Sequence, residues 1–217
     1  MIRLSYNLSE NTPSYGNRNK FRVKQTTVSV KSFFVTESEW LLETNHLGTH
    51  IDVPKHFIRN GISLSDFEDS FWFFNNVQVI DIPCDSGRLI EFSEVENKII
   101  DKENIELLLI RTGYEKYRTD EKYWRDNPGI SSDCAEKIIS EFPKLRGVGF
   151  DFISLTSYNF RDEGKQAHYN LLKNNLPFII IEDMKLSVAP KGEIDNLIIS
   201  PLFIENADGA PVSVFLI

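Results

Sequence analysis

The sequence predicts an α/β domain in which a mixed β-sheet core is flanked by short helices. Short apolar runs without alternation have the composition of strands that are buried on both faces of a sheet. Alternating polar and apolar residues upstream of them are typical of antiparallel strands. The length of 217 residues suits one domain, residues 1–217, which is large enough to bury about 70% of its unfolded surface.

The expected strands follow the chain in order. Residues 21–43 alternate or run apolar and predict antiparallel strands. The buried runs lie at residues 76–83, 106–111 and 178–181. Near the end of the chain, Asp208-Gly209 is a turn signal.

Two short helices are expected between these strands. Asp133-Cys134-Ala135-Glu136 has the D-x-x-E form of a capping box, and Pro143 ends the helix that follows. In residues 166–172, His168 shares one face with two leucines at i+3 and i+4. A histidine on such a face is more often a core residue than a metal ligand, so the helix alone gives His168 no role.

Composition excludes several classes of protein. The 41% hydrophobic and 26% charged content is that of a folded globular chain, and the net charge of −8 argues against a nucleic-acid or anionic-membrane partner. Cys84 and Cys134 are far apart and have no metal-like spacing, which indicates free thiols in a reducing compartment. No apolar run has the length of a membrane span or of a secretory signal. We therefore expect a cytoplasmic protein.

Three of the four histidines fall within eleven residues. His46, His50 and His56 stand at i, i+4 and i+10, and Asp52 stands at i+6. Imidazole and carboxylate are ligands that Zn²⁺ and Mn²⁺ take, and a catalytic site needs about three of them plus an open position. The segment therefore predicts a Zn²⁺ or Mn²⁺ site at His46, His50 and Asp52. The alternative is a polar surface loop in which the histidines cluster by chance.

An extended or looped backbone suits this segment better than a helix, because Gly48, Pro54 and three β-branched residues weaken or stop a helix. In an extended strand the three histidines and the aspartate have the same parity and point to one side. Gly48 lets the backbone bend so that both flanking rings reach one ion.

His56 has a separate predicted role. It lies roughly 13 Å of extended chain beyond Asp52, so a straight strand would hold it away from the same ion. Pro54 can turn the chain and bring the ring back over the cavity. Because histidine is the side chain that ordinarily exchanges protons near neutral pH, His56 is then the predicted general acid/base.

The pattern His46-x-Gly48-Thr49-His50-x-Asp52-x-Pro54-x-His56 resembles the signature of the metal-dependent cyclase/hydrolase family, which includes bacterial kynurenine formamidases and isatin hydrolases. The resemblance covers essentially the whole chain and implies a single domain of the swivelling β/β/α type. Further matching segments are residues 108–113, residues 127–131, Gly149-x-Asp151-x-x-Ser154, and the closing segments 197–202 and 208–212.

The resemblance also implies further ligands. Relatives can hold a second ion, bridged by the aspartate that matches Asp52 and completed by residues that match His168 and Glu182. A carboxylate that ends an apolar strand, as Glu182 does, costs desolvation energy unless it is paired or metal-bound. Because the spacing to Glu182 is two residues longer than usual, Asp183 and Glu163 are the alternative ligands.

The implied function is metal-dependent hydrolysis of an amide or formamide bond, with N-formylkynurenine as the leading substrate and His56 as acid/base to a metal-activated water. Alternatives are a hydrolase or cyclase of another cyclic amide, lactone or polyketide-like substrate, and a non-enzymatic metal-binding protein. The chain departs from its relatives at Arg3, at Tyr15-Gly16-Asn17 in the first loop, and at Thr156. We expect a small-molecule substrate and, as in relatives, a homodimer or tetramer.

Overall fold

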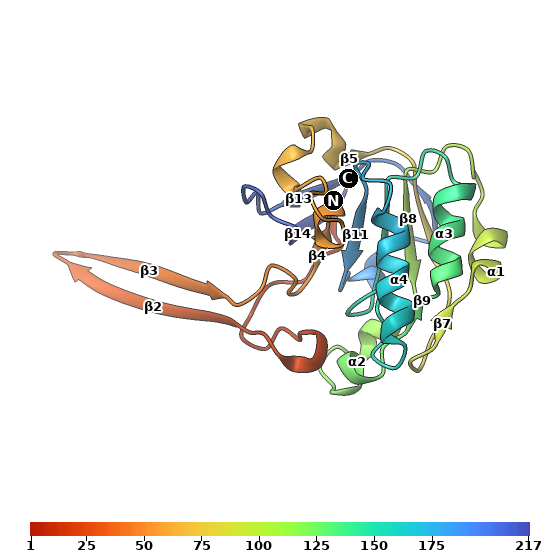
Figure 1. Cartoon of the computed structure of the whole chain (residues 1–217). Helices are drawn as coiled ribbons and strands as arrows, with labels where there is room; N and C mark the ends of the chain where they lie inside the picture. Colours follow the sequence, from red (N-terminus) through yellow and green to blue (C-terminus); the bar gives the residue numbers. More distant parts are fainter.

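The computed structural model describes residues 1–217 and is built on one ten-stranded mixed sheet (Figure 1). Its four central strands run parallel, and the strands outside them are antiparallel. In order across the sheet, the strands are β12 (Gly192–Ile194), β6 (Val77–Asp81), β8 (Leu107–Arg111), β10 (Gly147–Phe150), β11 (Ile179–Glu182), β4 (His50–Asp52), β14 (Gly209–Leu216), β13 (Leu197–Pro201) and β5 (Phe73–Phe74), with β1 (Ile2–Arg3) paired to β14.

The step from β11 to β4 is where the parallel part of the sheet ends, and it positions the candidate site. The two strands are antiparallel, and Glu182 is the direct partner of His50 in the register. Directly opposed residues lie on the same face of a sheet. The step therefore places the end of an apolar strand beside the histidine-rich segment, although 132 residues separate the two partners.

Two helices cover the face of the sheet on which Glu182 and His50 lie. α3 (Ser132–Glu141) and α4 (Arg161–Leu172) pack side by side (Figure 1). The remaining helical segments are short: α1 (Phe92–Val95), α2 (Lys122–Arg125), and the 3-10 turns Tyr15–Asn17, Pro54–His56, Leu64–Asp66, Asp69–Trp72, Glu96–Lys98, Tyr114–Tyr117 and Leu186–Val188. The expectation of a mixed sheet flanked by short helices is confirmed.

The predicted capping box of α3 is wrong. The residue before the helix is Ser131, whose hydroxyl accepts a hydrogen bond from the Cys134 backbone N–H at 3.1 Å. This satisfies one of the free N–H groups of the first turn. Asp133 is instead inside the first turn, where its carboxylate pairs with Lys137 at 2.9 Å. The helix ends at Glu141, close to Pro143 as expected.

The sheet separates two apolar cores. Ile180 and Phe150 face the helices and belong to one core, while Ile179 and Ile181 belong to the other. Alternate residues of β11 are therefore buried on opposite faces, which explains why this strand is a continuous apolar run. None of the helices is both long enough and apolar enough to cross a membrane.

Two smaller sheets lie outside this arrangement. β7 (Leu89–Ile90) pairs with β9 (Gly129–Ile130) near the helices. β2 (Phe21–Val30) and β3 (Phe33–Leu42) form an antiparallel hairpin that projects far from the rest of the molecule (Figure 1). We call this hairpin, residues 21–42, the arm. The predicted antiparallel strands at 21–43 are confirmed, but they do not join the main sheet.

Candidate functional site

The segment 46–56 forms one wall of the site, and only its middle is a strand. β4 spans His50–Asp52, so the alternation argument applies to His50 and Asp52 and not to the other two histidines. His46 is carried by a loop in which Gly48 has φ +67°. Pro54 begins a 3-10 turn that ends at His56, and the chain therefore turns where the proline was expected to turn it.

Two carboxylates hold the ring of His46. Its Nδ1 lies 2.7 Å from Asp52 Oδ1, and its Nε2 lies 3.1 Å from Asp208 Oδ2. Asp208 precedes β14, and the side-chain amide of Asn45 donates to it at 2.6 Å. Gly209 is needed here because a Cβ at this position would meet both the Ile51 carbonyl oxygen and the His46 ring. The closing strand can thus approach the histidine segment only with glycine at this place.

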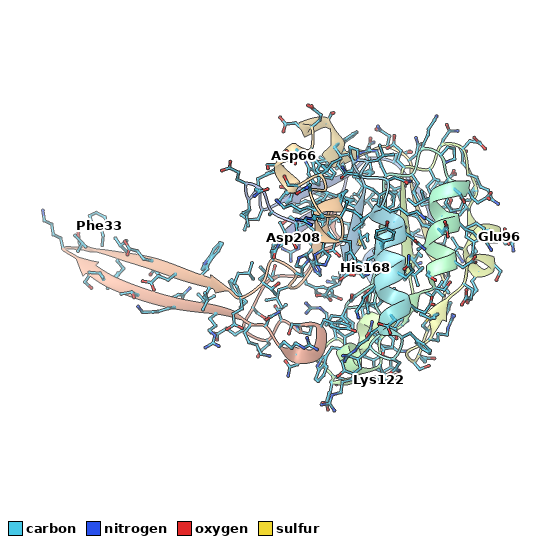
Figure 2. All side chains as sticks on the ribbon, viewed as in Figure 1. Phe33, Asp66, Glu96, Lys122, His168 and Asp208 are labelled. Carbon is cyan, nitrogen blue, oxygen red and sulfur yellow. The ribbon has the colours of Figure 1, made fainter.

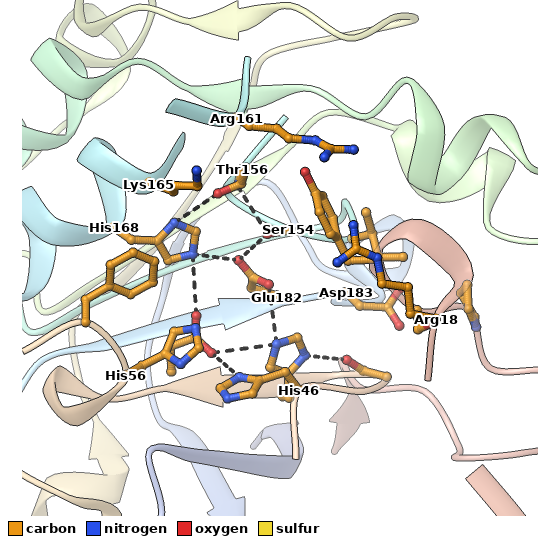
Figure 3. Close-up of a pocket in the computed structure, with 18 residues that line it drawn as sticks. Arg18, His46, His56, Ser154, Thr156, Arg161, Lys165, His168, Glu182 and Asp183 are labelled. Carbon is orange, nitrogen blue, oxygen red and sulfur yellow. Dashed lines mark hydrogen bonds and ion pairs between the residues drawn. The ribbon is translucent and has the colours of Figure 1, made fainter. Parts of the chain in front are cut away.

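His50 and His168 are oriented in the same way by different elements. The Nδ1–H of His50 donates to the Gly48 carbonyl at 2.8 Å, and that of His168 donates to the Gly164 carbonyl at 2.8 Å. Such a hydrogen bond fixes the orientation of the ring and turns Nε2 away from the backbone. Both Nε2 atoms then point at the same carboxylate, Glu182, at 3.3 Å from His50 and 3.4 Å from His168. Figure 3 shows the contact between His168 and Glu182.

Glu182 is the buried carboxylate of the opposite wall, 4% exposed at the end of β11. The Leu155 N–H donates to its Oε1 at 2.7 Å, and the Ser154 hydroxyl donates at 3.2 Å. Asp183 turns away: it has φ +53°, and its carboxylate accepts a bidentate pair from Arg118 at 2.8 and 2.7 Å. The structure therefore brings Glu182, and not Asp183, to the histidines.

Glu163, the other alternative ligand, is also outside the site. It is exposed on α4, where its carboxylate accepts a hydrogen bond from the Ser132 N–H at 3.1 Å. The helix geometry explains this. His168 faces the sheet, and Glu163, five residues before it, points to a different side of the helix.

Asp208 is a site residue that the sequence does not reveal, because the pattern around it predicts only a turn. Its Oδ2 lies 2.9 Å from His56 Nδ1 and also contacts His46. The only signal in the sequence is a carboxylate in an Asp-Gly turn, which is common in turns that have no function. The contact joins residues 152 positions apart, and the packing of β14 against β4 produces it.

Opposite charges keep this cluster ionised. Burial by itself would lower the pKa of His46 and His168, but the adjacent carboxylates raise both values to about 10. Burial would raise the pKa of Glu182, as would the charge of Asp52, but hydrogen bonds from His168 and His50 lower it to about 2. Without an ion, protons on the histidines thus balance the buried carboxylates.

The donor set fits a divalent metal ion. The candidate ligand atoms form two groups whose members lie within 4.8 Å of one another, and Asp52 belongs to both. One group adds His46 and His56, and the other adds His50 and Glu182. Buried carboxylates that face each other repel unless protons or a cation lie between them. Imidazole nitrogen together with carboxylate oxygen suits Zn²⁺ or Mn²⁺.

A cavity of about 380 Å³ opens onto this cluster (Figure 3). Tyr15 and Arg18 line it from the first loop, and Arg161 and Lys165 line it from α4. Phe57 also lines it and stacks on the His168 ring, with centroids 4.7 Å apart. The cavity therefore combines a histidine–carboxylate floor with aromatic walls and three cationic side chains.

The fold and the cluster define an α/β protein in which a buried set of histidine and carboxylate side chains faces a cavity. The Cyclase family, described as "Putative cyclase", matches residues 2–156. A kynurenine formamidase from Bacillus thuringiensis subsp. konkukian is 31% identical over 173 residues, covering 77% of this chain and 73% of that protein. The chain belongs to the cyclase family.

Solved structures show the same fold. A predicted metal-dependent hydrolase from Bacillus stearothermophilus matches with a TM-score of 0.77 at 24% identity, over 99% of this chain and 96% of that one. Isatin hydrolase A from Ralstonia solanacearum matches with a TM-score of 0.78 at 19% identity, over 98% of this chain and 89% of that one.

A curated protein from Haemophilus influenzae, described as uncharacterized, is 27% identical over 110 residues, half of this chain and 78% of that protein.

Proposed function

We propose that this protein is a metal-dependent hydrolase that cleaves the C–N bond of an aryl formamide, with N-formylkynurenine as the leading substrate. The chain is an enzyme of the cyclase family, and a relative named kynurenine formamidase supports hydrolysis of an amide. The observation that carries the proposal is the convergence of His50 and His168 on Glu182, with both Nε2 atoms directed at one carboxylate.

We propose that five side chains bind the metal that activates water for the reaction. The proposed ligands of one or two Zn²⁺ or Mn²⁺ ions are His46, His50, Asp52, His168 and Glu182. When bound there, the ion supplies a Lewis acid that activates water and polarises the amide carbonyl. The backbone and hydroxyl donors on Glu182 hold that carboxylate in place against the repulsion of Asp52.

His56 is the proposed acid/base. Its Nδ1 is held by Asp208 at 2.9 Å, so Nε2 is left to take a proton from water and return one to the leaving amine. A leaving aniline needs a proton to depart as a neutral amine. The ring of His56 lies 4.1 Å from that of His46 and borders the cavity, which puts it within reach of a bound amide.

The cavity wall favours a substrate that carries a carboxylate. Arg18, Arg161 and Lys165 all line the cavity, whereas the carboxylates there are engaged with histidines or with Arg118. Guanidinium groups bind carboxylates through paired hydrogen bonds. The rings of Tyr15 and Phe57 supply faces for an aryl group. An aryl formamide with an anionic substituent satisfies both features.

A cyclic amide or a lactone is the second candidate substrate. Tyr15 and Arg18 lie in the first loop, where this chain departs from the sequence of its relatives. Because residues of that loop face the cavity, a loop sequence that differs from that of the relatives changes the shape and charge offered to a substrate. The cavity and His56 argue against a protein that only binds metal, because a structural site needs neither an open face nor a free acid/base.

The test compares a matched pair of amides with the metal-loaded and the chelated protein. Formanilide and 4-formamidobenzoate differ by one carboxylate, and N-formylkynurenine and a small lactone complete the panel. We expect turnover that chelation abolishes and Zn²⁺ or Mn²⁺ restores, with a higher kcat/KM for the carboxylate. Arg161→Gln should lower kcat/KM for 4-formamidobenzoate and leave formanilide unchanged. Full turnover in metal-free protein, or cleavage of the lactone alone, contradicts the proposal.

A further inference from the structure

A second buried group of side chains lies next to Glu182, and none of its members is a proposed ligand or acid/base. Its centre is Asp183, which is 1% exposed and follows β11 directly. Arg118 donates to the Asp183 carboxylate from Nε at 2.8 Å and from Nη2 at 2.7 Å, and the Tyr123 hydroxyl donates at 2.5 Å. We call Asp183, Arg118 and Tyr123 the clamp. Figure 3 shows Asp183 on the opposite side of Glu182 from His168.

The backbone turns sharply at Asp183. Its φ is +53°, a left-handed conformation in which aspartate, asparagine and glycine are more common than other residues. The turn sends two neighbouring carboxylates to different partners. Glu182 contacts the Nε2 atoms of His50 and His168. Asp183 contacts Arg118 instead. The contacts that fix this turn therefore also fix the direction of the Glu182 carboxylate.

Two hydrogen bonds hold the backbone of Asp183. Its N–H donates to the Phe152 carbonyl at 2.9 Å, and its carbonyl accepts from the Thr49 hydroxyl at 2.6 Å. That hydroxyl in turn accepts from the Tyr6 N–H at 2.9 Å. Thr49 directly precedes His50, so this one turn is bonded to the histidine wall of the site and continues the strand that forms the opposite wall.

Arg118 is itself held in place. Its guanidinium carbon lies 3.9 Å from the centre of the Tyr6 ring, a stacked arrangement that orients the planar group. A buried carboxylate is strongly destabilising unless a charge or hydrogen-bond donors compensate it. Without Arg118, the cavity would have a third uncompensated carboxylate in addition to Asp52 and Glu182. The clamp therefore keeps the charge of Asp183 apart from the histidine–carboxylate cluster.

Tyr123 connects the clamp to α2, a helix outside the sheet. Lys122, the first residue of α2, lies at the lower end of the molecule, below His168 in the view of Figure 2. The Tyr123 ring is fully buried and stacks with that of Tyr114, with centroids 6.1 Å apart. A rigid aromatic side chain thus carries a hydrogen-bond donor from α2 to the turn after β11.

We propose that the clamp directs the Glu182 carboxylate into the candidate site, and that Asp183 is a positioning residue. The inference rests on the proposed function, in which Glu182 is a metal ligand. Metal ligands are commonly oriented by hydrogen-bonded groups outside the ligand set, and loss of such a group typically weakens metal binding ~10–100-fold. Here the effect passes through the backbone: the clamp holds the turn, and the turn directs the neighbouring carboxylate.

The first test measures the position of Glu182 without metal. The Leu155 N–H donates to Glu182 Oε1 at 2.7 Å, so hydrogen exchange at Leu155 reports whether that carboxylate is in place. Tyr123→Phe removes one donor to Asp183 and leaves the left-handed backbone unchanged. The variant should exchange the Leu155 amide roughly 10-fold faster than the unmodified protein does, relative to the amides of β8.

Tyr114→Phe is the matched control. Tyr114 is as deeply buried as Tyr123, and its hydroxyl donates to the carbonyls of Lys122 and Asp126 and not to the clamp. The control should lose stability, yet its Leu155 amide should stay as protected as in the unmodified protein, relative to β8. Equal exchange at Leu155 in the two variants overturns the proposal.

The second test measures Zn²⁺ affinity by isothermal titration with variants of Asp183 itself. Asp183→Gly adopts the left-handed backbone without steric cost but removes the clamp, so it should bind Zn²⁺ ~10–100-fold more weakly. Asp183→Asn tolerates the same backbone and keeps one acceptor oxygen, so it should recover most of that loss. An Asp183→Gly variant that folds and binds Zn²⁺ as the unmodified protein does overturns the proposal, because the backbone alone would then direct Glu182.

The two tests separate the positioning role from the proposed function. If the unmodified protein binds neither Zn²⁺ nor Mn²⁺ and cleaves no amide, the proposed function fails, but exchange at Leu155 still decides whether the clamp positions Glu182. If the unmodified protein binds metal and Tyr123→Phe exchanges as Tyr114→Phe does, the proposed function stands and the positioning role is wrong.

Discussion

The Asp208 carboxylate lies 2.9 Å from His56 Nδ1, and through the same oxygen it also contacts His46. Hydrogen bonds from both histidines hold the pKa of Asp208 well below its usual range. The carboxylate is therefore ionised at every working pH and accepts a hydrogen bond from His56. One side chain at the start of the last strand links the predicted acid/base to a proposed ligand.

Asp208→Asn should lower kcat by roughly 10–100-fold, because an amide no longer fixes the orientation and tautomer of His56. Metal content, measured by inductively coupled plasma mass spectrometry, should stay within a factor of two. Asn45→Ala, which removes only the neighbouring donor to Asp208, is the milder control. If kcat is unchanged in Asp208→Asn, the contact has no part in the reaction.

His56→Ala should retain its metal and lose roughly 10²-fold or more in kcat, since general acid/base catalysis contributes typically 10²–10⁴-fold. The ring of His56 is close enough to His46 and Asp52 to be a metal ligand as well as an acid/base. The geometry fits both roles, and this measurement distinguishes them. Loss of metal from the variant would make His56 a ligand. Retention of both metal and rate would place the acid/base at another residue.

His168→Ala and Glu182→Ala should each reduce bound metal, because each removes one proposed ligand. The Nε2 of His168 faces Asp52, and the carboxylate of Glu182 faces the Nε2 of His50. Glu163→Gln, on the same helix as His168 but exposed and outside the cluster, is the matched control and should bind metal as the unmodified protein does. Equal metal content in Glu182→Ala and Glu163→Gln would remove Glu182 from the ligand set.

The metal-free protein should be most stable between about pH 4.5 and 6.5. His46 and His168, raised from 6.5 to about 10, contribute stability that is complete below pH 6.5 and is lost as the pH rises towards 10. Glu182, lowered from 4.5 to about 2, contributes stability that is complete above pH 4.5 and is lost as the pH falls towards 2.

Urea unfolding of the chelated protein at a series of pH values checks this. The metal-loaded protein should behave differently: its stability relative to the metal-free form should rise with pH, because ligand histidines must lose their protons to bind an ion. Isothermal titration in buffers of different ionisation enthalpy should show proton release on metal binding. A metal-free protein that is as stable at pH 9 as at pH 6 contradicts the assigned charges.

Gly48→Ala should destabilise the protein and lower its metal content. Residue 48 has φ +67°, and a Cβ there would lie 2.7 Å from Leu8 Cδ2. Gly113→Ala is a matched control, because its φ is +74° and a Cβ meets nothing within 4 Å. The control should lose about 1–2 kcal/mol from the left-handed backbone alone. The free energy of unfolding should fall further in Gly48→Ala, and equal losses would show that the contact with Leu8 relaxes freely.

Local chemistry in the sequence predicted much of the site. The spacing of His46, His50 and Asp52 needs no knowledge of the fold, because the backbone between them is short and contains Gly48 to bend it. The apolar run that ends in Glu182 likewise predicts a buried strand with a carboxylate that needs partners. The strand-parity argument was correct only for His50 and Asp52, since turns on either side carry the other histidines.

The sequence alone determined the α/β class, the central apolar strands, the antiparallel pattern of the arm and the group of histidines with one carboxylate at residues 46–56, because each of these depends on neighbours within about ten positions. Only the tertiary structure decided that Glu182 pairs with His50, that Asp208 reaches His56 and that the arm leaves the sheet. The first two relationships join residues more than a hundred positions apart, and the third depends on which strands pair in the main sheet. The packing of the whole chain sets all three, and no local sequence pattern predicts them.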